Sequence, residues 1–331
     1  MKGFQYVRAR SVAGAIEALA APDAKLLAGG TTLYDLMKLR VETPAVVVDI
    51  QRLKELNYID TSRPRELVFG SGARMSDVAD NPLIKRDYPA LSESLWRAAS
   101  QQLRNMATLG GNLLQRTRCG YFRGGAPFPC NKREPGSGCA AIDGIDRGHA
   151  LFGGSASCIA TYPGDLAVAL VAFDAVVDVV GPGGRRTVPV SELHREPGDT
   201  PHIDHVLRRD EIIVAVRVPR TTAGRGSTYL KIRDRESYAF ALTSAATGLT
   251  LARGGVVEDC RIALGGVGTR PIRATRAEES LVGKRVTEAT ARAAGELAFA
   301  GAKPGHHNAF RVELGIRTVA DALVIAKKRA L

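Results

Sequence analysis

Four of the five cysteines in this 331-residue chain lie close together in one segment, as Cys119, Cys130, Cys139 and Cys158. Four thiolates can hold a metal ion or an iron–sulfur cluster. The surrounding segment is rich in Gly, Pro and Arg and has little apolar periodicity, so it buries too little apolar surface to order itself. Bonds from thiolates to an inorganic centre would supply the missing order.

Three kinds of centre are compatible with these cysteines. Zinc sites usually contain pairs of cysteines two to four residues apart, and this segment has no such pair. Two disulfides would require export, and a domain of this size does not need disulfides to be stable. An iron–sulfur cluster tolerates varied spacing, so the spacing alone leaves all three open. Cys260, in a predicted strand, is expected to be a small buried hydrophobe.

The segment around the cysteines is also cationic, which suits an anionic thiolate cluster. The alternative is that these charges are simply solvated. The basic residues are Arg104, Arg116, Arg118, Arg123, Lys132, Arg133 and Arg147, against the acidic Glu134, Asp143 and Asp146.

A first glycine turn has the pattern of an anion site. Residues 25–28 predict a short buried strand, Gly29 and Gly30 a tight turn, and Thr31 or Thr32 the cap of a helix, with a second buried strand at 45–50. Free backbone N–H groups at such a turn can bind phosphate. The alternative is an ordinary strand-to-helix turn.

A second glycine turn follows a helix expected over residues 91–106, at Ala107-Thr108-Leu109-Gly110-Gly111-Asn112. Two such turns, in different α/β units, could each bind one of the two phosphates of a dinucleotide. Neither turn has the G-x-G-x-x-G spacing, which disfavours a Rossmann fold. The glycines at 265–268 are expected to form a structural turn after a strand at 261–264.

The composition excludes some classes of protein. The net charge is +12, but aromatic residues make up only 5% and do not interleave with a basic stripe, so nucleic-acid binding is disfavoured and an acidic partner favoured. No apolar run is long enough to span a membrane, and MKGFQYVRARS lacks the apolar core of a signal peptide. The six histidines show no ligand spacing and are expected at the surface or in loops.

Several stretches together resemble one family. AKLLAGGTTLYDLMK, ATLGGN and TYPGDLAVALVAFDA are similar to the FAD-binding stretches of flavin subunits of the xanthine dehydrogenase and carbon monoxide dehydrogenase family of molybdenum hydroxylases. YLKIRDRESYAFALTSAA and RIALGGVGTRPIRATRAEESLVG resemble its C-terminal flavoprotein domain. The resemblance implies an α+β fold: a PCMH-like FAD-binding domain in two parts, residues 1–55 and 56–225, and an α+β domain over 226–331.

The cysteine segment resembles an insertion, at about residues 113–158, that carries a [4Fe-4S] cluster in a subset of the family. QRTRCGYFR and PCNKREPGSGCAA carry this resemblance. The subset includes periplasmic aldehyde oxidoreductases, to which the chain looks most similar, and 4-hydroxybenzoyl-CoA reductases. The resemblance implies that Cys119, Cys130, Cys139 and Cys158 are the four ligands.

The resemblance also implies roles around FAD. Residues 26–33 would wrap the pyrophosphate, Asp165 would bind ribose hydroxyls or cap the following helix, and Lys231 and Tyr238 would lie near the isoalloxazine. Tyr238 departs from NAD-using relatives, which carry an acidic residue there, so NAD use is not expected. The implied cofactor-binding residues are Leu26, Leu27, Ala28, Gly29, Gly30, Thr31, Thr32, Leu33, Thr108, Gly111, Asn112, Asp165, Lys231 and Tyr238.

The function implied is electron transfer, without a catalytic acid or base. The chain would be the flavin subunit of a heterotrimer, with a [2Fe-2S] subunit and a large molybdopterin-binding subunit that oxidises an aldehyde. Co-export with a signal-bearing partner would place it in the periplasm; the alternative is the cytoplasm. Other candidates are the flavin subunit of a hydroxybenzoyl-CoA reductase-like enzyme, a free-standing flavin oxidoreductase, and a non-catalytic subunit with a zinc or disulfide loop.

Overall fold

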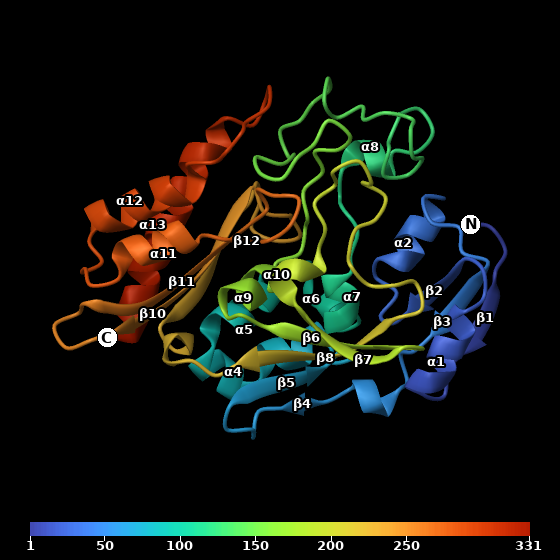
Figure 1. The fold of residues 1–331 in the computed structure, drawn as a ribbon, viewed down its shortest axis with the longest axis horizontal. Helices are drawn as coiled ribbons and strands as arrows, with labels where there is room; N and C mark the ends of the chain where they lie inside the picture. Colours follow the sequence, from blue (N-terminus) through green and yellow to red (C-terminus); the bar gives the residue numbers. More distant parts are fainter.

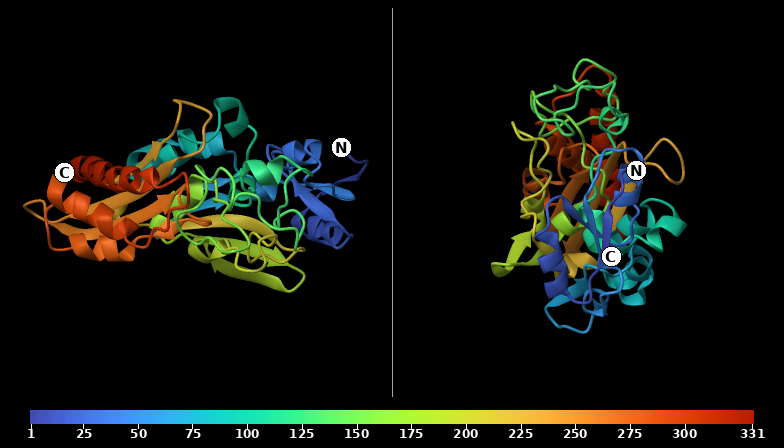
Figure 2. Two further views of the ribbon diagram at one scale, coloured as in Figure 1. Left: turned by 90° about the horizontal axis from the view of Figure 1, so that it is seen from above. Right: turned by 90° about the vertical axis from the view of Figure 1, so that its right-hand side faces the viewer.

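The computed structural model describes all 331 residues, which form three separate β-sheets with helices packed on them. The sheets follow one another along an elongated molecule, with the N-terminal sheet at one end and the C-terminal helices at the other (Figure 1, Figure 2). Both sheets and helices are present in each part. The predicted α+β class is therefore confirmed.

The N-terminal sheet is small and parallel, in the order β1-β3-β2. Ser11 caps α1 by accepting a hydrogen bond from the Gly14 N–H at 3.1 Å, as such a residue is expected to do. The elements are β1 (Gln5–Arg8), α1 (Val12–Leu19), β2 (Ala24–Leu27), α2 (Leu33–Lys38) and β3 (Val46–Asp49).

The middle sheet has five strands in the order β4-β5-β8-β6-β7, all antiparallel. Its strands are β4 (Ile59–Asp60), β5 (Glu66–Gly70), β6 (Val176–Gly181), β7 (Gly184–Pro189) and β8 (Ile212–Pro219). The helices between its strands in the chain are α3 (Met75–Asp80), α4 (Pro82–Asp87), α5 (Pro89–Trp96), α6 (Gln101–Arg104), α7 (Leu109–Leu113), α9 (Leu166–Ala172) and α10 (Val190–Leu193). The short α8 (Gly120–Arg123) lies in the cysteine loop, away from this sheet (Figure 1).

The C-terminal sheet has the order β12-β11-β10-β9 and is antiparallel. Cys260 lies in β11 and is 4% exposed, so its prediction as a small buried hydrophobe is confirmed. The elements are β9 (Ser227–Ile232), β10 (Thr243–Leu251), β11 (Val257–Gly265), β12 (Ile272–Arg273), α11 (Thr275–Leu281), α12 (Glu288–Phe299) and α13 (Phe310–Ala330); short 3-10 turns cover Lys54–Leu56 and Thr222–Gly224.

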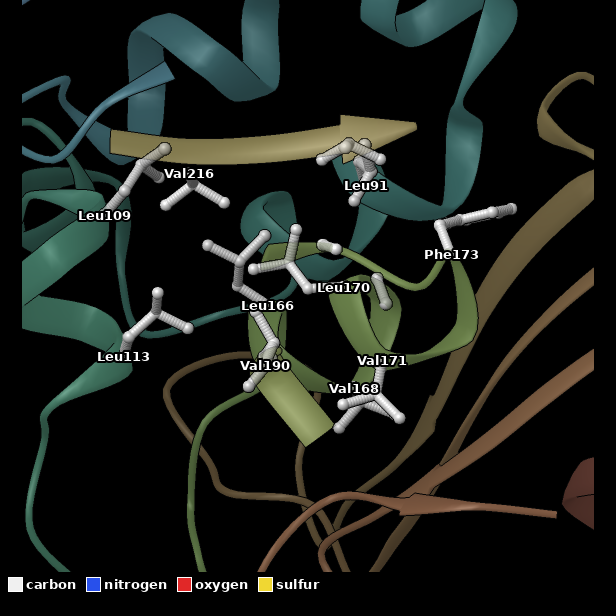
Figure 3. Packing of buried hydrophobic residues seen from close by; sticks show 14 of the residues in the cluster. Leu91, Leu109, Leu113, Leu166, Val168, Leu170, Val171, Phe173, Val190 and Val216 are labelled. Atoms are coloured by element: carbon white, nitrogen blue, oxygen red, sulfur yellow. The ribbon is translucent and has the colours of Figure 1, made fainter. Parts of the chain in front are cut away.

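The largest hydrophobic core is built around α9. Every residue of this helix is buried, and it packs between α5, α7 and the strands of both larger sheets. Figure 3 shows Leu166 and Leu170 of α9 among Leu109, Leu113 and Val216, which come from α7 and β8. A helix that is apolar on all sides belongs in the interior, and here it joins the middle and C-terminal parts.

The helix expected over residues 91–106 is broken in two, so that prediction was wrong in its extent. α5 ends at Trp96 and α6 begins at Gln101. Ala99 between them has a φ of +48°, outside the helical range, and Ser100 caps α6 by accepting from the Leu103 N–H. A serine that bonds to the backbone ahead of it favours a new helix start over a continuous helix.

Each predicted domain contains one of the three sheets, while the boundaries at residues 55 and 225 stay predictions. None of the helices combines the length and the apolar character needed to cross a membrane.

Candidate functional site

The first glycine turn lies directly against the segment that leads into the second one. Leu26 and Leu27 end β2, Leu33 begins α2, and Ala28 to Thr32 connect them. A side chain at Gly29 would overlap the backbone carbonyl of Met106, and Gly30 has a φ of +73°. Both glycines are therefore required, one by the close approach of two backbones and the other by a left-handed conformation.

The backbone of the first turn offers free donors. None of the N–H groups from Gly29 to Leu33 donates a hydrogen bond within the protein. Thr32 occupies the N-cap position of α2, but its hydroxyl makes no capping bond, so this hydroxyl is free as well. A row of unpaired N–H groups beside free threonine hydroxyls can bind an anionic group such as a phosphate.

The second turn offers fewer free backbone donors than expected. Thr108 caps α7 by accepting from the Gly111 N–H at 3.3 Å, and the Gly110 N–H donates to the Ser71 carbonyl at 2.8 Å. What remains is the Asn112 side chain, whose buried amide oxygen has no hydrogen-bond partner. A buried acceptor without a partner is costly, so a polar ligand atom at this turn would satisfy it. The two turns together therefore fit a polar, anionic cofactor.

Asp165 and Lys231 form a buried ion pair between the middle and C-terminal parts. Lys231 Nζ lies 2.8 Å from Asp165 Oδ2, and the Tyr229 hydroxyl donates to Asp165 Oδ1 at 2.6 Å. The side chains of Asp165 and Lys231 are 5% and 1% exposed. Asp165 stands at the N-cap of α9 without making a side-chain capping bond, so the predicted capping role is wrong. Its predicted ribose contact stays a prediction.

Removing only one member of this pair is expected to destabilise the fold strongly. Lys231→Met leaves the Asp165 carboxylate buried beside the Tyr229 hydroxyl alone, which should lower the free energy of unfolding by about 3–5 kcal/mol. Urea unfolding of the FAD-free chain measures this loss. The double variant Asp165→Asn/Lys231→Met should lose less free energy of unfolding than the sum of the losses in the two single variants. Losses that add exactly would contradict the pairing.

Tyr238 is on the surface and not in the core. Its side chain is 57% exposed, its φ is +55°, and the guanidinium of Arg235 lies 5.6 Å from its ring centroid. Tyr238 is therefore not a packed core residue. The exposed ring is available to cover a flat group bound nearby.

The loop of residues 113–158 lies at the upper side of Figure 1, around α8. It brings the four predicted ligand cysteines into one region. Cys130 and Cys139 pair as an isolated antiparallel bridge, and Cys119 packs with Cys130 against Phe122 and Leu36. All five cysteines are free, which does not favour the disulfide alternative.

The thiols of this region differ in acidity, and burial raises the pKa of Cys119. A hydrogen bond with the Cys158 thiol lowers the pKa of Cys139 to about 6 and raises the pKa of Cys158. His149 Nε2 lies 3.2 Å from Cys119 Sγ. No three His, Cys, Asp or Glu side chains come close enough to share one metal ion.

Several cations of this loop form internal ion pairs, so the alternative of solvated charges is wrong for Arg116, Arg123 and Lys132, whereas the Arg147 side chain stays 48% exposed. Arg116 bonds to Glu42 at 2.6 Å and to Asp204 at 2.8 Å, and Lys132 also contacts Asp204. Arg123 bonds to Asp35 of α2 at 2.6 Å. The loop is thereby fastened to the N-terminal part that carries the first glycine turn.

Two of the six histidines are buried, although both lie in loops outside the helices and strands, as the prediction of surface or loop positions allows. His149 is 7% and His194 6% exposed, and burial lowers the pKa of His194 to about 4. His194 Nε2 contacts the Leu113 carbonyl at 2.8 Å. A signal was present in the sequence: each histidine stands directly beside buried apolar residues, Ala150 and Leu193.

Arg311 is another buried polar residue that local sequence patterns do not reveal. It is fully buried, and its guanidinium donates to the carbonyls of Leu242, His149 and Gly266. It joins the cysteine loop to the C-terminal part. No local pattern distinguishes it from the many exposed arginines of the chain.

Comparison with known proteins gives a consistent result over the whole chain. Residues 2–221 match the FAD binding domain in molybdopterin dehydrogenase, and residues 228–324 match the CO dehydrogenase flavoprotein C-terminal domain. The chain is 44% identical to the aldehyde oxidoreductase FAD-binding subunit PaoB of Escherichia coli, with all of both chains covered. It is 28% identical to the glyceraldehyde dehydrogenase medium chain of Sulfolobus acidocaldarius over 86% of this chain and 83% of that one.

The fold agrees with these sequence relationships. A structure of carbon monoxide dehydrogenase from Hydrogenophaga pseudoflava, lacking the Mo-pyranopterin moiety of the molybdenum cofactor, matches with a TM-score of 0.78 and 28% identity, covering 100% of this chain and 99% of that one. The chain therefore belongs to the family of FAD-binding subunits of molybdopterin dehydrogenases, the molybdenum hydroxylases.

Proposed function

We propose that this chain is the electron-transfer flavin subunit of a heterotrimeric molybdenum hydroxylase that oxidises aldehydes. The observation that carries the proposal is the contact of the two glycine turns, one with a row of free N–H groups and the other with an unpaired buried amide oxygen. The aldehyde substrate is supported by the full-length relative whose name is aldehyde oxidoreductase FAD-binding subunit.

The residues of the two turns have distinct roles in this proposal. The N–H groups from Gly29 to Leu33 and the hydroxyls of Thr31 and Thr32 hold the FAD pyrophosphate. Thr108, Gly111 and Asn112 hold the adjoining polar groups, and Asp165 accepts from ribose hydroxyls. When bound, FAD supplies reversible exchange of electrons singly or in pairs. The protein needs no acid or base for this task; its residues position the cofactor and tune its surroundings.

We propose one [4Fe-4S] cluster on Cys119, Cys130, Cys139 and Cys158. One feature of the residues supports it: the four free thiols lie together in one loop, where Cys130 pairs with Cys139 and packs with Cys119. When bound, the cluster supplies one-electron chemistry and fixes the loop through its bonds to the thiolates. Loop cations also bond to Glu42, Asp204 and Asp35, so order in the loop extends to the first glycine turn.

The remaining proposals concern partners and location. A [2Fe-2S] subunit and a large molybdopterin-binding subunit would complete the heterotrimer and deliver electrons to this chain. Several relatives are named as medium chains or subunits, which fits a protein that acts within an assembly. Co-export with a signal-bearing partner would place the complex in the periplasm. Cell fractionation followed by detection of this chain tests the location.

The purified heterotrimer is expected to oxidise an aldehyde with a dye or quinone acceptor but not with NAD. The chain has no G-x-G-x-x-G sequence, and the exposed Tyr238 stands where the resemblance places an acidic residue in NAD-using relatives. Absorbance of NADH at saturating NAD, compared with dye reduction under the same conditions, measures the difference.

Two outcomes would overturn this proposal. Efficient NADH formation by the heterotrimer would contradict the acceptor assignment. Aldehyde oxidation by the isolated chain would contradict the assignment of substrate chemistry to a partner and would instead support a free-standing flavin oxidoreductase.

A further inference from the structure

Arg118 of the cysteine loop is held beside the helix that follows the first glycine turn. Its Nη1 atom lies 3.4 Å from Oδ2 of Asp35, which is in the first turn of α2. On its other side the guanidinium lies 5.1 Å from the ring centroid of Phe240, in the segment between β9 and β10. Arg118 therefore lies where the N-terminal part, the cysteine loop and the C-terminal part meet.

The Arg118 guanidinium does not make all the hydrogen bonds that a buried charged group needs. Its Nε atom is buried without any hydrogen-bond partner, although the side chain as a whole is 25% exposed. An arginine N–H withdrawn from water and left unpaired is costly, because the group is charged. An unpaired donor of this kind points to an acceptor that binds at this position.

Charge at this position also favours an anionic acceptor. Arg118 and Arg123 share the single carboxylate of Asp35, and no other carboxylate forms an ion pair with either of them. One positive charge is therefore left uncompensated.

We propose that Arg118 is a FAD-binding residue whose Nε–H group donates to the pyrophosphate of FAD held at the Gly29–Thr32 turn. The inference rests on the proposed FAD site and extends it, because it adds a residue from the cysteine loop to a site built from two glycine turns. Charge-assisted bonds from arginine to phosphate are among the strongest in proteins. The loop would thus contribute directly to cofactor affinity in addition to carrying thiolates.

The test is titration of the FAD-free full-length chain with two probes, FAD and ADP. ADP contains the pyrophosphate but no isoalloxazine ring. Arg118→Gln is expected to weaken the binding of both probes by about 10- to 100-fold, as the loss of one charged hydrogen bond predicts. Arg118→Lys keeps the positive charge but lacks the planar guanidinium. Its affinity for both probes should lie between that of the wild type and that of Arg118→Gln. Isothermal calorimetry measures both probes, and iron content of the reconstituted chain shows whether the loop is intact.

Arg123→Gln is the matched control. Arg123 bonds to the same Asp35 carboxylate, but it has no unpaired buried nitrogen. Its substitution should change FAD and ADP affinity by less than about threefold. An equal loss in Arg123→Gln and Arg118→Gln would mean that both act only through Asp35 and α2, and would overturn the proposal.

Two further outcomes would also overturn it. Unchanged affinity of Arg118→Gln for both probes would show that Arg118 makes no contact with the cofactor. Weaker binding of FAD with unchanged binding of ADP would show that Arg118 contacts the flavin ring and not the pyrophosphate. Failure of the wild-type chain to bind FAD at all would instead refute the proposed FAD site, so the two proposals fail in different ways.

Discussion

Gly29→Ala is expected to abolish FAD retention in the purified protein. A Cβ at this position would overlap the Met106 carbonyl and lie 2.9 Å from the Ala107 Cα, and these are backbone atoms that cannot rotate away. The first turn would have to move off the segment leading into the second. In the proposed site the free N–H groups of Gly29 to Leu33 must be correctly placed to bind the pyrophosphate, so the FAD content should fall from near one per chain to below about a tenth.

The control for this substitution is Gly3→Ala. A Cβ at Gly3 meets no atom within 4 Å, and its backbone is not left-handed, so FAD content should remain that of the wild type. Absorbance of released FAD, relative to protein, measures both variants. Full FAD occupancy in Gly29→Ala would show that the contact between the turns is not needed and that the cofactor lies elsewhere.

Cys130→Ser is expected to remove the iron and acid-labile sulfide of the proposed cluster. Cys130 is buried, and it lies between Cys139, its bridge partner, and Cys119, with which it packs. A serine hydroxyl is a much poorer ligand for iron at neutral pH than a thiolate. Loss of the cluster should also loosen residues 113–158, because thiolate bonds order a segment that buries little apolar surface. Hydrogen exchange of this segment should therefore increase.

Cys260→Ala serves as the control, since Cys260 is buried in β11 and far from the loop in sequence. Its iron content should equal that of the wild type. Unchanged iron in Cys130→Ser would exclude Cys130 as a ligand. Zinc in place of iron in the wild-type protein would overturn the cluster proposal entirely.

Local patterns were sufficient where one segment determines its own structure. Ser11 caps α1, as a serine just before an apolar run favours, and the apolar residues of 166–172 form a helix buried on every side. The strand, turn and helix around Gly29 also follow from local preferences, because glycine permits a φ of +73° at Gly30. The break between α5 and α6 was missed because apolar spacing continues across it, while Ser100 starts a new helix.

Long-range pairing could not be read from such patterns. The sequence suggested that Asp165 caps α9, whereas its carboxylate pairs with Lys231, which lies 66 positions later. The cations of the cysteine loop looked like solvated charges or partners of a cluster, and several of them bond to carboxylates of the N-terminal part. An isolated charge carries no local sign of the partner that it will meet after folding.

By itself, the sequence determined the family, the α+β class and the residues with the chemistry for a cofactor site, since these depend on residue types and on motifs within short segments. The tertiary structure decided which of these residues meet. It placed Gly29 against Met106, buried Asp165 with Lys231, and set Arg118 between Asp35 and Phe240 with an unpaired donor. The physical reason is that burial and pairing energies depend on distances between segments remote in the chain, and these distances exist only after the three sheets have packed together.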